Sequence, residues 1–124
     1  MIAADASSLS ALLSGEAGPD VDRLAEELNR GELRLPPVVL TELLTDAGVA
    51  KLLGPKLRDL ELLEITPGYW QRASETRAKL KSRGLKANIA GALIAQSCID
   101  HDVALITRDA DFRHFAKYCG LKLA

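Results

Sequence analysis

Several features that mark secreted, membrane or cysteine-rich metal proteins are scarce in this chain. Its only cysteines, Cys98 and Cys119, are too far apart for a zinc knuckle or a redox pair, so we expect two reduced thiols. His101 and His114 match no metal-ligand spacing and are expected at the surface. No apolar stretch approaches the roughly 18 residues of a membrane span, and Met1 leads into a strand rather than a signal segment. We therefore expect a cytoplasmic protein without a membrane partner.

An excess of charge of one sign is also lacking. The 16 basic and 17 acidic residues leave a net charge of −1, which gives no overall indication of a nucleic-acid binder. Hydrophobic residues make up 48% of the 124, enough for one domain, residues 1–124, to bury a core without disulfides. Aromatic residues make up only 4%, so we assign most of them to the core rather than to stacking on bases.

The charges are unevenly distributed along the chain. Residues 16–32 are rich in Asp and Glu, whereas residues 72–86 are rich in Lys and Arg. The basic segment is either the solvated face of an amphipathic helix or a surface that binds the phosphates of a nucleic acid. The residues that would hold phosphates are Arg72, Arg77, Lys79, Lys81, Arg83 and Lys86, with Arg108 and Arg113.

Alternation of strands and helices predicts an α/β fold. Short apolar runs predict strands at 2–5, 33–35, 62–66 and 103–107, with a possible fifth at 121–123. Expected helices span 7–13, 21–30, 38–47, 66–83 and 89–101, and Gly48 and then Gly54-Pro55 divide the stretch before residue 62 into two short helices. Strands joined by helices form right-handed units. We therefore expect a mostly parallel sheet of four to five strands with helices on both faces.

Local signals refine these helices. The expected N-caps are Ser7, Asp20, Thr66 and Asn88, and Thr66 is followed by a proline suited to a first helical position. Two helices have faces that we predict to be buried, and their residues are Val38, Val39, Leu43 and Leu44 on the first and Tyr69, Trp70, Ala73 and Leu80 on the second.

Three acidic residues that are remote in the sequence are predicted to meet. Asp5 ends the first strand, Asp109 follows the strand at 103–107, and Glu42 lies on a helix near the boundary between core and cleft. A carboxylate after a parallel strand points at the crevice where open α/β sheets bind ligands. Crowded carboxylates repel one another, and a divalent cation relieves the repulsion. This pattern predicts a Mg²⁺ or Mn²⁺ site for phosphoryl transfer, with Asp5, Glu42 and Asp109 as its catalytic acids.

Three neighbouring residues have supporting roles in this prediction, and two of them have a second interpretation. The hydroxyls of Ser7 and Thr107 would orient ligands or water, although Ser7 equally suits a helix cap. Asp111 is either a further metal ligand beside Asp5 and Asp109 or the N-cap of a turn that continues to Phe115.

The order and spacing of these segments resemble the PIN-domain nucleases and, more narrowly, the VapC-type ribonuclease toxins. The resemblance runs over essentially the whole chain and is carried by Asp5-Ala6-Ser7, Leu40-Thr41-Glu42-Leu43, Ala92-Leu93-Ile94-Ala95, Leu105-Ile106-Thr107-Arg108-Asp109 and Asp111-Phe112. It implies a single PIN-like domain that acts as a Mg²⁺- or Mn²⁺-dependent endoribonuclease of a toxin–antitoxin pair. It also implies an RNA substrate, a cognate antitoxin protein as partner, and a homodimer.

The chain departs from the family pattern at Gly91, where the family carries an Asp. In the first turn of a helix, Gly costs up to about 1 kcal/mol relative to Ala, whereas a carboxylate gains about 0.3–1 kcal/mol from the helix dipole. Either close backbone packing favours Gly91, or an acidic ligand has been lost. The second explanation implies that the chain binds divalent metal poorly and is weak or inactive as an enzyme.

Two other functions stay open at this stage. A catalytically inactive toxin scaffold would still bind an antitoxin, whose C-terminal arm would occupy the acidic cleft, and Gly91 favours this alternative. A receiver domain or a haloacid-type phosphatase also ends a strand with Asp. However, Asp5 is not followed two residues later by the second Asp of the phosphatases, and Lys86 does not follow a strand as a receiver lysine does.

Overall fold

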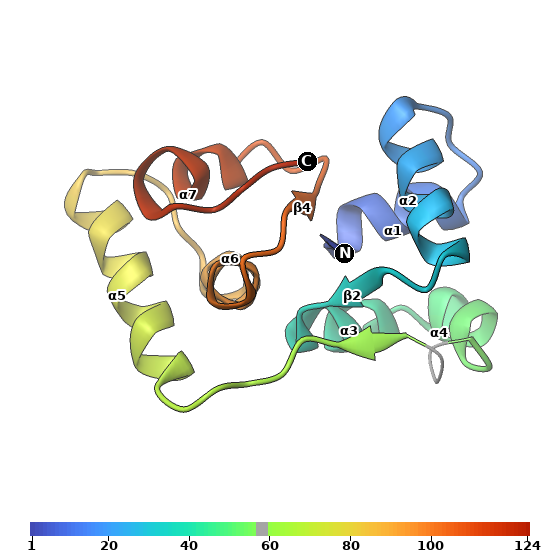
Figure 1. The fold of residues 1–124 in the computed structure, drawn as a ribbon, viewed down its shortest axis with the longest axis horizontal. Coiled ribbons are helices and arrows are strands. Elements are labelled where there is room, and N and C mark those ends of the chain that lie inside the picture. The colour runs from blue at the N-terminus through green and yellow to red at the C-terminus, as the bar shows by residue number, and fades with distance from the viewer. Residues whose placement is uncertain (57–59) are drawn as a thin grey trace.

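The computed structural model describes residues 1–56 and 60–124 (Figure 1). Its sheet has parallel pairing throughout and the strand order β3-β2-β1-β4. The strands are β1 (Ile2–Ala4), β2 (Leu33–Leu35), β3 (Glu61–Leu62) and β4 (Leu105–Ile106). Because Ala3 pairs with Arg34 on one side and with Leu105 on the other, β1 is a central strand. The predicted α/β fold with a parallel sheet is confirmed.

The helices of the described residues lie between and after these strands. They are α1 (Ala6–Leu13), α2 (Pro19–Asn29), α3 (Pro37–Thr45), α4 (Ala47–Leu53), α5 (Tyr69–Ser82), α6 (Ile89–His101) and α7 (Phe112–Cys119). The first three strands extend the sheet in one direction, and the chain then returns through α5 and α6 to place β4 on the other side of β1. Right-handed crossovers put this returning connection on the opposite face of the sheet from the earlier ones. Figure 1 shows α5, α6 and α7 gathered on one side of the molecule.

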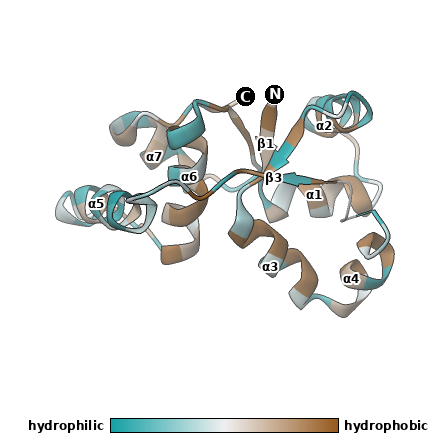
Figure 2. Ribbon diagram, turned by 60° about the horizontal axis from the view of Figure 1, so that its bottom comes forward, coloured by the Kyte–Doolittle hydropathy of each residue, from teal (hydrophilic) through white to brown (hydrophobic). Residues whose placement is uncertain are grey.

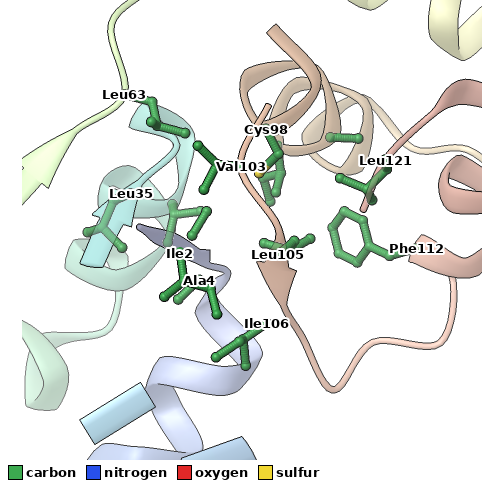
Figure 3. Packing of buried hydrophobic residues seen from close by; sticks show 14 of the residues in the cluster. Ile2, Ala4, Leu35, Leu63, Cys98, Val103, Leu105, Ile106, Phe112 and Leu121 are labelled. Atoms are coloured by element: carbon green, nitrogen blue, oxygen red, sulfur yellow. The ribbon is translucent and has the colours of Figure 1, made fainter. Parts of the chain in front are cut away.

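The core is built on the strands. Ile2, Leu35 and Leu105 are at most 1% exposed, and Figure 3 shows Leu105 between Ile2 of β1 and Phe112 of α7. Strands that are buried on both faces form continuous apolar runs rather than alternating ones. This is why β1 and β4 were recognisable in the sequence.

Some strands and helices differ from the sequence predictions in extent. The strands predicted at 62–66 and 103–107 are only β3 and β4, and the possible fifth strand at 121–123 is an isolated bridge between Leu105 and Leu123. The second of the two short helices predicted before residue 62 falls on a stretch that includes residues 57–59, outside the described ranges, and the first is α4. Its start is fixed by Asp46, whose side chain accepts a hydrogen bond from the backbone N of Val49 at 3.0 Å.

Three predicted helix caps were wrong. Asp5, not Ser7, caps α1 by accepting from the backbone N of Ser8 at 3.0 Å. The residue before α2 is Gly18 rather than Asp20, and α5 follows Gly68 rather than Thr66, because Gly68 has the positive φ of 82° that breaks the chain direction there. The predicted cap at Asn88 is confirmed.

Two residues predicted to face the core are exposed instead. Trp70 is 62% exposed and Leu44 is 44% exposed. Successive residues of a helix point about 100° apart, so burial of Tyr69 and Leu43 turns their immediate neighbours outward.

The cysteines are free, as predicted. Burial, with a smaller contribution from the charge of Asp5, raises the pKa of the Cys98 thiol to about 12. This thiol therefore stays protonated and unreactive at neutral pH. Over the described ranges of the chain, none of the helices combines the length and the apolar character needed to cross a membrane.

Candidate active site

The strand order reverses between β1 and β4, and the predicted acids lie at that point. Asp5 directly follows β1, and Thr107 directly follows β4. Open α/β sheets bind ligands in the crevice beyond the carboxyl ends of the strands on either side of such a reversal. A cavity of about 160 Å³ occupies this place, and its lining includes Asp5, Ser7, Glu42, Asn88, Gly91 and Asp109. The structure thus brings together the three carboxylates that the sequence analysis singled out.

Asp5 is held in place by hydroxyl groups. Asp5 is only 4% exposed. The Ser7 Oγ donates to both of its carboxylate oxygens, at 2.8 and 3.0 Å. The Thr107 Oγ1 donates to Asp5 Oδ2 at 2.5 Å. Several donors thus hold one carboxylate in a single orientation. Ser7 and Thr107 therefore fix the orientation of Asp5, which agrees with the orienting role predicted for their hydroxyls.

Glu42 extends from α3 into the same cavity without such support. Loss of hydration, and secondly repulsion from the Asp5 carboxylate, raise the pKa of Glu42 above its usual range. The glutamate therefore holds a proton more readily than a free one does. The repulsion is also what a bound cation at this place would relieve.

Replacing Glu42 with Gln is expected to leave stability unchanged or slightly higher near pH 7. A raised folded-state pKa means that ionisation of Glu42 disfavours the folded chain at neutral pH, and that this penalty disappears when acid protonates the group. The effect is a few tenths of a kcal/mol because the side chain is exposed and screened. Urea unfolding at neutral pH and near pH 4 measures it. A clear loss of stability at neutral pH would contradict the assignment.

Asp109 and Asp111 occupy the loop between β4 and α7. Asp109 donates its backbone N–H to Thr107 Oγ1 at 3.0 Å, and its Oδ1 accepts from the backbone N of Asp111 at 2.9 Å. Asp111 precedes α7 but makes no side-chain cap; its Oδ2 lies 3.4 Å from the Lys86 Nζ. Of its two predicted roles, the position as N-cap residue is therefore confirmed, although without a capping hydrogen bond from the side chain, whereas the metal role stays a prediction.

Gly91 lines the acidic cavity in the first turn of α6. Its backbone N donates to Asn88 Oδ1 at 2.6 Å, and a Cβ at this position would lie 2.7 Å from that oxygen and 3.6 Å from Phe115 Cε2. The nearest obstacle is thus the end of a side chain that can rotate. A larger residue at 91 therefore requires Asn88 Oδ1 to shift from its capping position rather than any backbone to move, and position 91 lines the same cavity as the carboxylates. This favours the lost-acid explanation over the close-packing one.

Three of the arginines proposed to hold phosphates have partners within the fold. Arg72 donates to Asp100, Arg77 Nε donates to the Ala87 carbonyl oxygen at 2.9 Å, and Arg108 pairs with Asp20. Lys79, in contrast, is exposed on α5, a helix that Figure 2 shows as largely hydrophilic. None of these four side chains lines the acidic cavity. Their binding of RNA stays a prediction.

One cavity residue was missed as a functional candidate. Asn88 was assigned only a capping role, yet it lines the cavity together with Gly91 and Asp109. Its position three residues before the expected acid was the only signal in the sequence. The amide of Asn88 is a polar group within the cavity that ligands can contact.

The site suits a divalent cation in chemistry but not in number of ligands. Carboxylate oxygens are the donors that Mg²⁺ and Mn²⁺ prefer. However, the oxygens of Asp5 are already engaged by hydroxyl and backbone donors. Within residues 1–56 and 60–124, no three His, Cys, Asp or Glu side chains are close enough together to hold a metal ion. The loss of an acidic ligand at Gly91 would account for this shortage, and it stays a prediction.

Comparisons with known proteins agree with the fold. Solved structures that are similar include VapBC2 from Rickettsia felis bound to a promoter DNA fragment, with a TM-score of 0.73, 20% identity and coverage of 100% of this chain and 98% of that one. DNA-bound VapBC from Salmonella typhimurium gives a TM-score of 0.76 at 16% identity, over 100% and 98% of the two chains. FitAcB from Neisseria gonorrhoeae gives 0.72 at 17% identity, over 99% and 96%.

No curated protein matches the chain. The family model of the PIN domain matches residues 2–118, a span that contains every residue of the acidic cavity. Members of this family are generally nucleases. The chain therefore belongs to the PIN domain family.

Proposed function

We propose that the chain is a metal-dependent endoribonuclease toxin of a toxin–antitoxin pair, acting on RNA in the cytoplasm. The observation that carries the proposal is that Asp5, Glu42 and Asp109, remote in sequence, line one cavity beyond the ends of β1 and β4. The similarity to VapBC assemblies supports the narrower assignment to VapC-type toxins and a cognate antitoxin as partner.

Each cavity residue has a role in this proposal. Asp5 and Asp109 face the reacting phosphate, and the hydroxyls of Ser7 and Thr107 keep Asp5 aimed at it. Glu42, whose pKa is raised, accepts a proton from the attacking water on a carboxylate oxygen. When bound, Mg²⁺ or Mn²⁺ would neutralise the carboxylates and stabilise the charge that develops on the phosphate.

Replacing Asp5 with Asn is expected to lower cation-dependent RNA cleavage by about 100-fold or more, because the site loses a charge in a water-poor place. The measurement is cleavage of a labelled RNA with Mn²⁺ and with a chelator. Asp102→Asn is the matched control, since Asp102 is exposed, lies at the end of α6 and pairs with Lys122 at 2.6 Å. Cleavage that survives Asp5→Asn would refute the nuclease assignment.

Gly91 also supports a second candidate, a toxin scaffold that binds its antitoxin without cutting RNA. The two candidates separate when the product of a neighbouring small reading frame is copurified with the chain and RNA cleavage is measured in parallel. A chain that binds this product but does not cleave RNA, even after Gly91→Asp, is a scaffold.

The homodimer implied by the resemblance has a suitable surface around Trp70. The Trp70 side chain is exposed and lines two neighbouring hollows. One, of about 560 Å³, lies between α5 and α6, and the other, of about 230 Å³, lies beside α3; Leu93 lines both. In a two-fold dimer the same surface of each subunit meets its copy, so the side chain that projects from one subunit can enter the hollow of the other. Trp70→Asp is therefore expected to convert a dimer to a monomer in sedimentation equilibrium, with Leu52→Asp as control because Leu52 is equally exposed on α4. A parent chain that is already monomeric would contradict this.

A further inference from the structure

The turn between α1 and α2 is tied to the loop that carries the site acids. Arg108 lies in that loop, and its guanidinium forms two bonds to Asp20, from Nε to Oδ2 at 2.7 Å and from Nη2 to Oδ1 at 3.1 Å. The Nη2 also donates to the Ala17 carbonyl oxygen at 3.2 Å, and Nη1 lies 3.5 Å from Glu16 Oε1. One side chain from the β4–α7 loop thus contacts two residues of the α1–α2 turn and Asp20 in the first turn of α2, some ninety positions earlier.

The fork geometry makes this pair more specific than an ordinary surface ion pair. Two parallel N–H···O bonds fix both partners in orientation as well as distance. The hydrogen bond to Arg108 is the main reason why the pKa of Asp20 is lowered, and the same bond raises the pKa of Arg108. Both groups therefore stay charged and paired throughout the neutral range.

Gly18 shows that the turn is shaped around the pair. Its φ of 152° is a conformation that other residues rarely adopt, and a Cβ there would lie 2.6 Å from Asp20 Oδ1 and 3.2 Å from Arg108 Nη2. A side chain at position 18 would push into the fork itself. Glycine at this position is therefore required by the contact.

Arg108 is also hydrogen-bonded to the Asp5 cluster, which we define as Asp5, Ser7, Thr107 and Asp109. The backbone N of Arg108 donates to Ser7 Oγ at 3.0 Å, and the neighbouring Thr107 Oγ1 joins Asp5 to the backbone of Asp109. We infer that Arg108 is a positioning residue: its side chain anchors the loop from outside, so that Thr107 and Asp109 stay in register with Asp5. Its effect on catalysis rests on the proposed nuclease function.

Hydrogen exchange tests this positioning role without requiring activity. The amides of Asp109 and Asp111 donate to side chains within the loop, and the amide of Ser8 donates to Asp5, which Thr107 of the loop holds, so their exchange reports whether the loop keeps its place beside Asp5. Arg108→Ala is expected to speed their exchange about fivefold to tenfold while the buried amides of α6 exchange as before. Arg108→Lys should not rescue protection, since one ammonium cannot form the fork.

Two further variants separate positioning from general stabilisation. Asp20→Ala should reproduce the exchange change, and the double variant should add little to either single one, because both remove the same contact. Arg30→Ala is the matched control, as it breaks an exposed arginine–glutamate pair of α2 with Glu27. Unchanged exchange at the three amides, or equal acceleration throughout the chain, would overturn the proposal.

Kinetics in the Gly91→Asp background give the second measurement. If Arg108 positions the loop, Arg108→Ala lowers kcat about tenfold and leaves KM nearly unchanged. If Arg108 holds the RNA backbone instead, KM rises, the salt dependence of binding flattens, and the inference is wrong. Absence of cleavage in every variant counts against the proposed function, and the exchange measurement still decides the positioning role.

Discussion

Replacing Gly91 with Asp is expected to raise Mn²⁺-dependent RNA cleavage by about 10- to 100-fold, the usual effect of a carboxylate that supports a metal site. The position lines the cavity of Asp5, Glu42 and Asp109, and its backbone has no positive φ that would demand glycine. The measurement is the cleavage rate of a labelled RNA against Mn²⁺ concentration.

Two control variants isolate the charge at position 91. Gly91→Asn adds a side chain of the same size without charge, and Gly91→Ala adds only the Cβ that displaces Asn88 Oδ1. Only Asp should gain activity. It should also lower the melting temperature without a cation, because a further carboxylate is repelled by the others, and recover it when Mn²⁺ is added. No gain in cleavage would contradict the lost-acid explanation.

Replacing Arg72 with Ala is expected to destabilise the fold by about 2–3 kcal/mol, a larger loss than a surface arginine gives. Its guanidinium donates to Asp100 at 3.1 and 2.7 Å, to the Pro67 carbonyl oxygen at 2.8 Å and to Thr66 Oγ1 at 2.8 Å. It thereby joins the start of α5 to α6. The Asp100 side chain is only 10% exposed, so the substitution leaves a nearly buried carboxylate without its cation.

The pH dependence of this loss has a definite sign. Burial pushes the pKa of Asp100 upward most strongly, but the hydrogen bonds from Arg72 and Gln96 and the charge of Arg72 together outweigh it and leave the pKa below its usual value. A lowered folded-state pKa contributes stability above the unfolded value of about 4, and this contribution is lost as pH falls through the folded value. The gap between parent and Arg72→Ala should therefore be full at neutral pH and narrow near pH 3.

Lys79→Ala is the matched control for this prediction. It removes an exposed cation of the same helix, and urea unfolding should change by less than about 0.5 kcal/mol. If Lys79 holds RNA, its loss should weaken binding to all RNAs and reduce the salt slope by about one. If Arg72→Ala leaves stability unchanged but weakens RNA binding, Arg72 binds RNA and does not stabilise the fold, which contradicts the prediction.

The parts of the site that the sequence predicted depend on local pattern. Asp5 and Asp109 each follow a short apolar run, and a parallel sheet brings the carboxyl ends of such runs to one edge whatever lies between them. Their meeting could therefore be predicted before any contact was known. The pairing of β4 with β1, by contrast, could not be predicted without the strand order. That order reverses because the chain returns through α5 and α6 to the far side of β1.

The parts that the sequence did not predict depend on contacts between remote segments. The basic stretch at 72–86 indicated a phosphate-binding face, yet Arg72 and Arg77 are engaged by Asp100 and by the Ala87 carbonyl. Nothing local marks Asp20 as the partner of Arg108 either. A charge pattern records how many ions a segment carries, whereas the pairing of those ions is decided by the tertiary packing.

The two thiols are buried to different extents, so their reactivity can report local unfolding of the core. Cys98 is buried on α6, close enough to Asp5 to feel its charge, whereas Cys119 is only half-buried at the end of α7. A maleimide should label Cys119 first, and Cys98 only in molecules whose central layer has come apart. Mass spectrometry of the labelled chain needs no engineered probe. It would report whether the core around Cys98 opens more often when RNA, a cation or a protein partner binds.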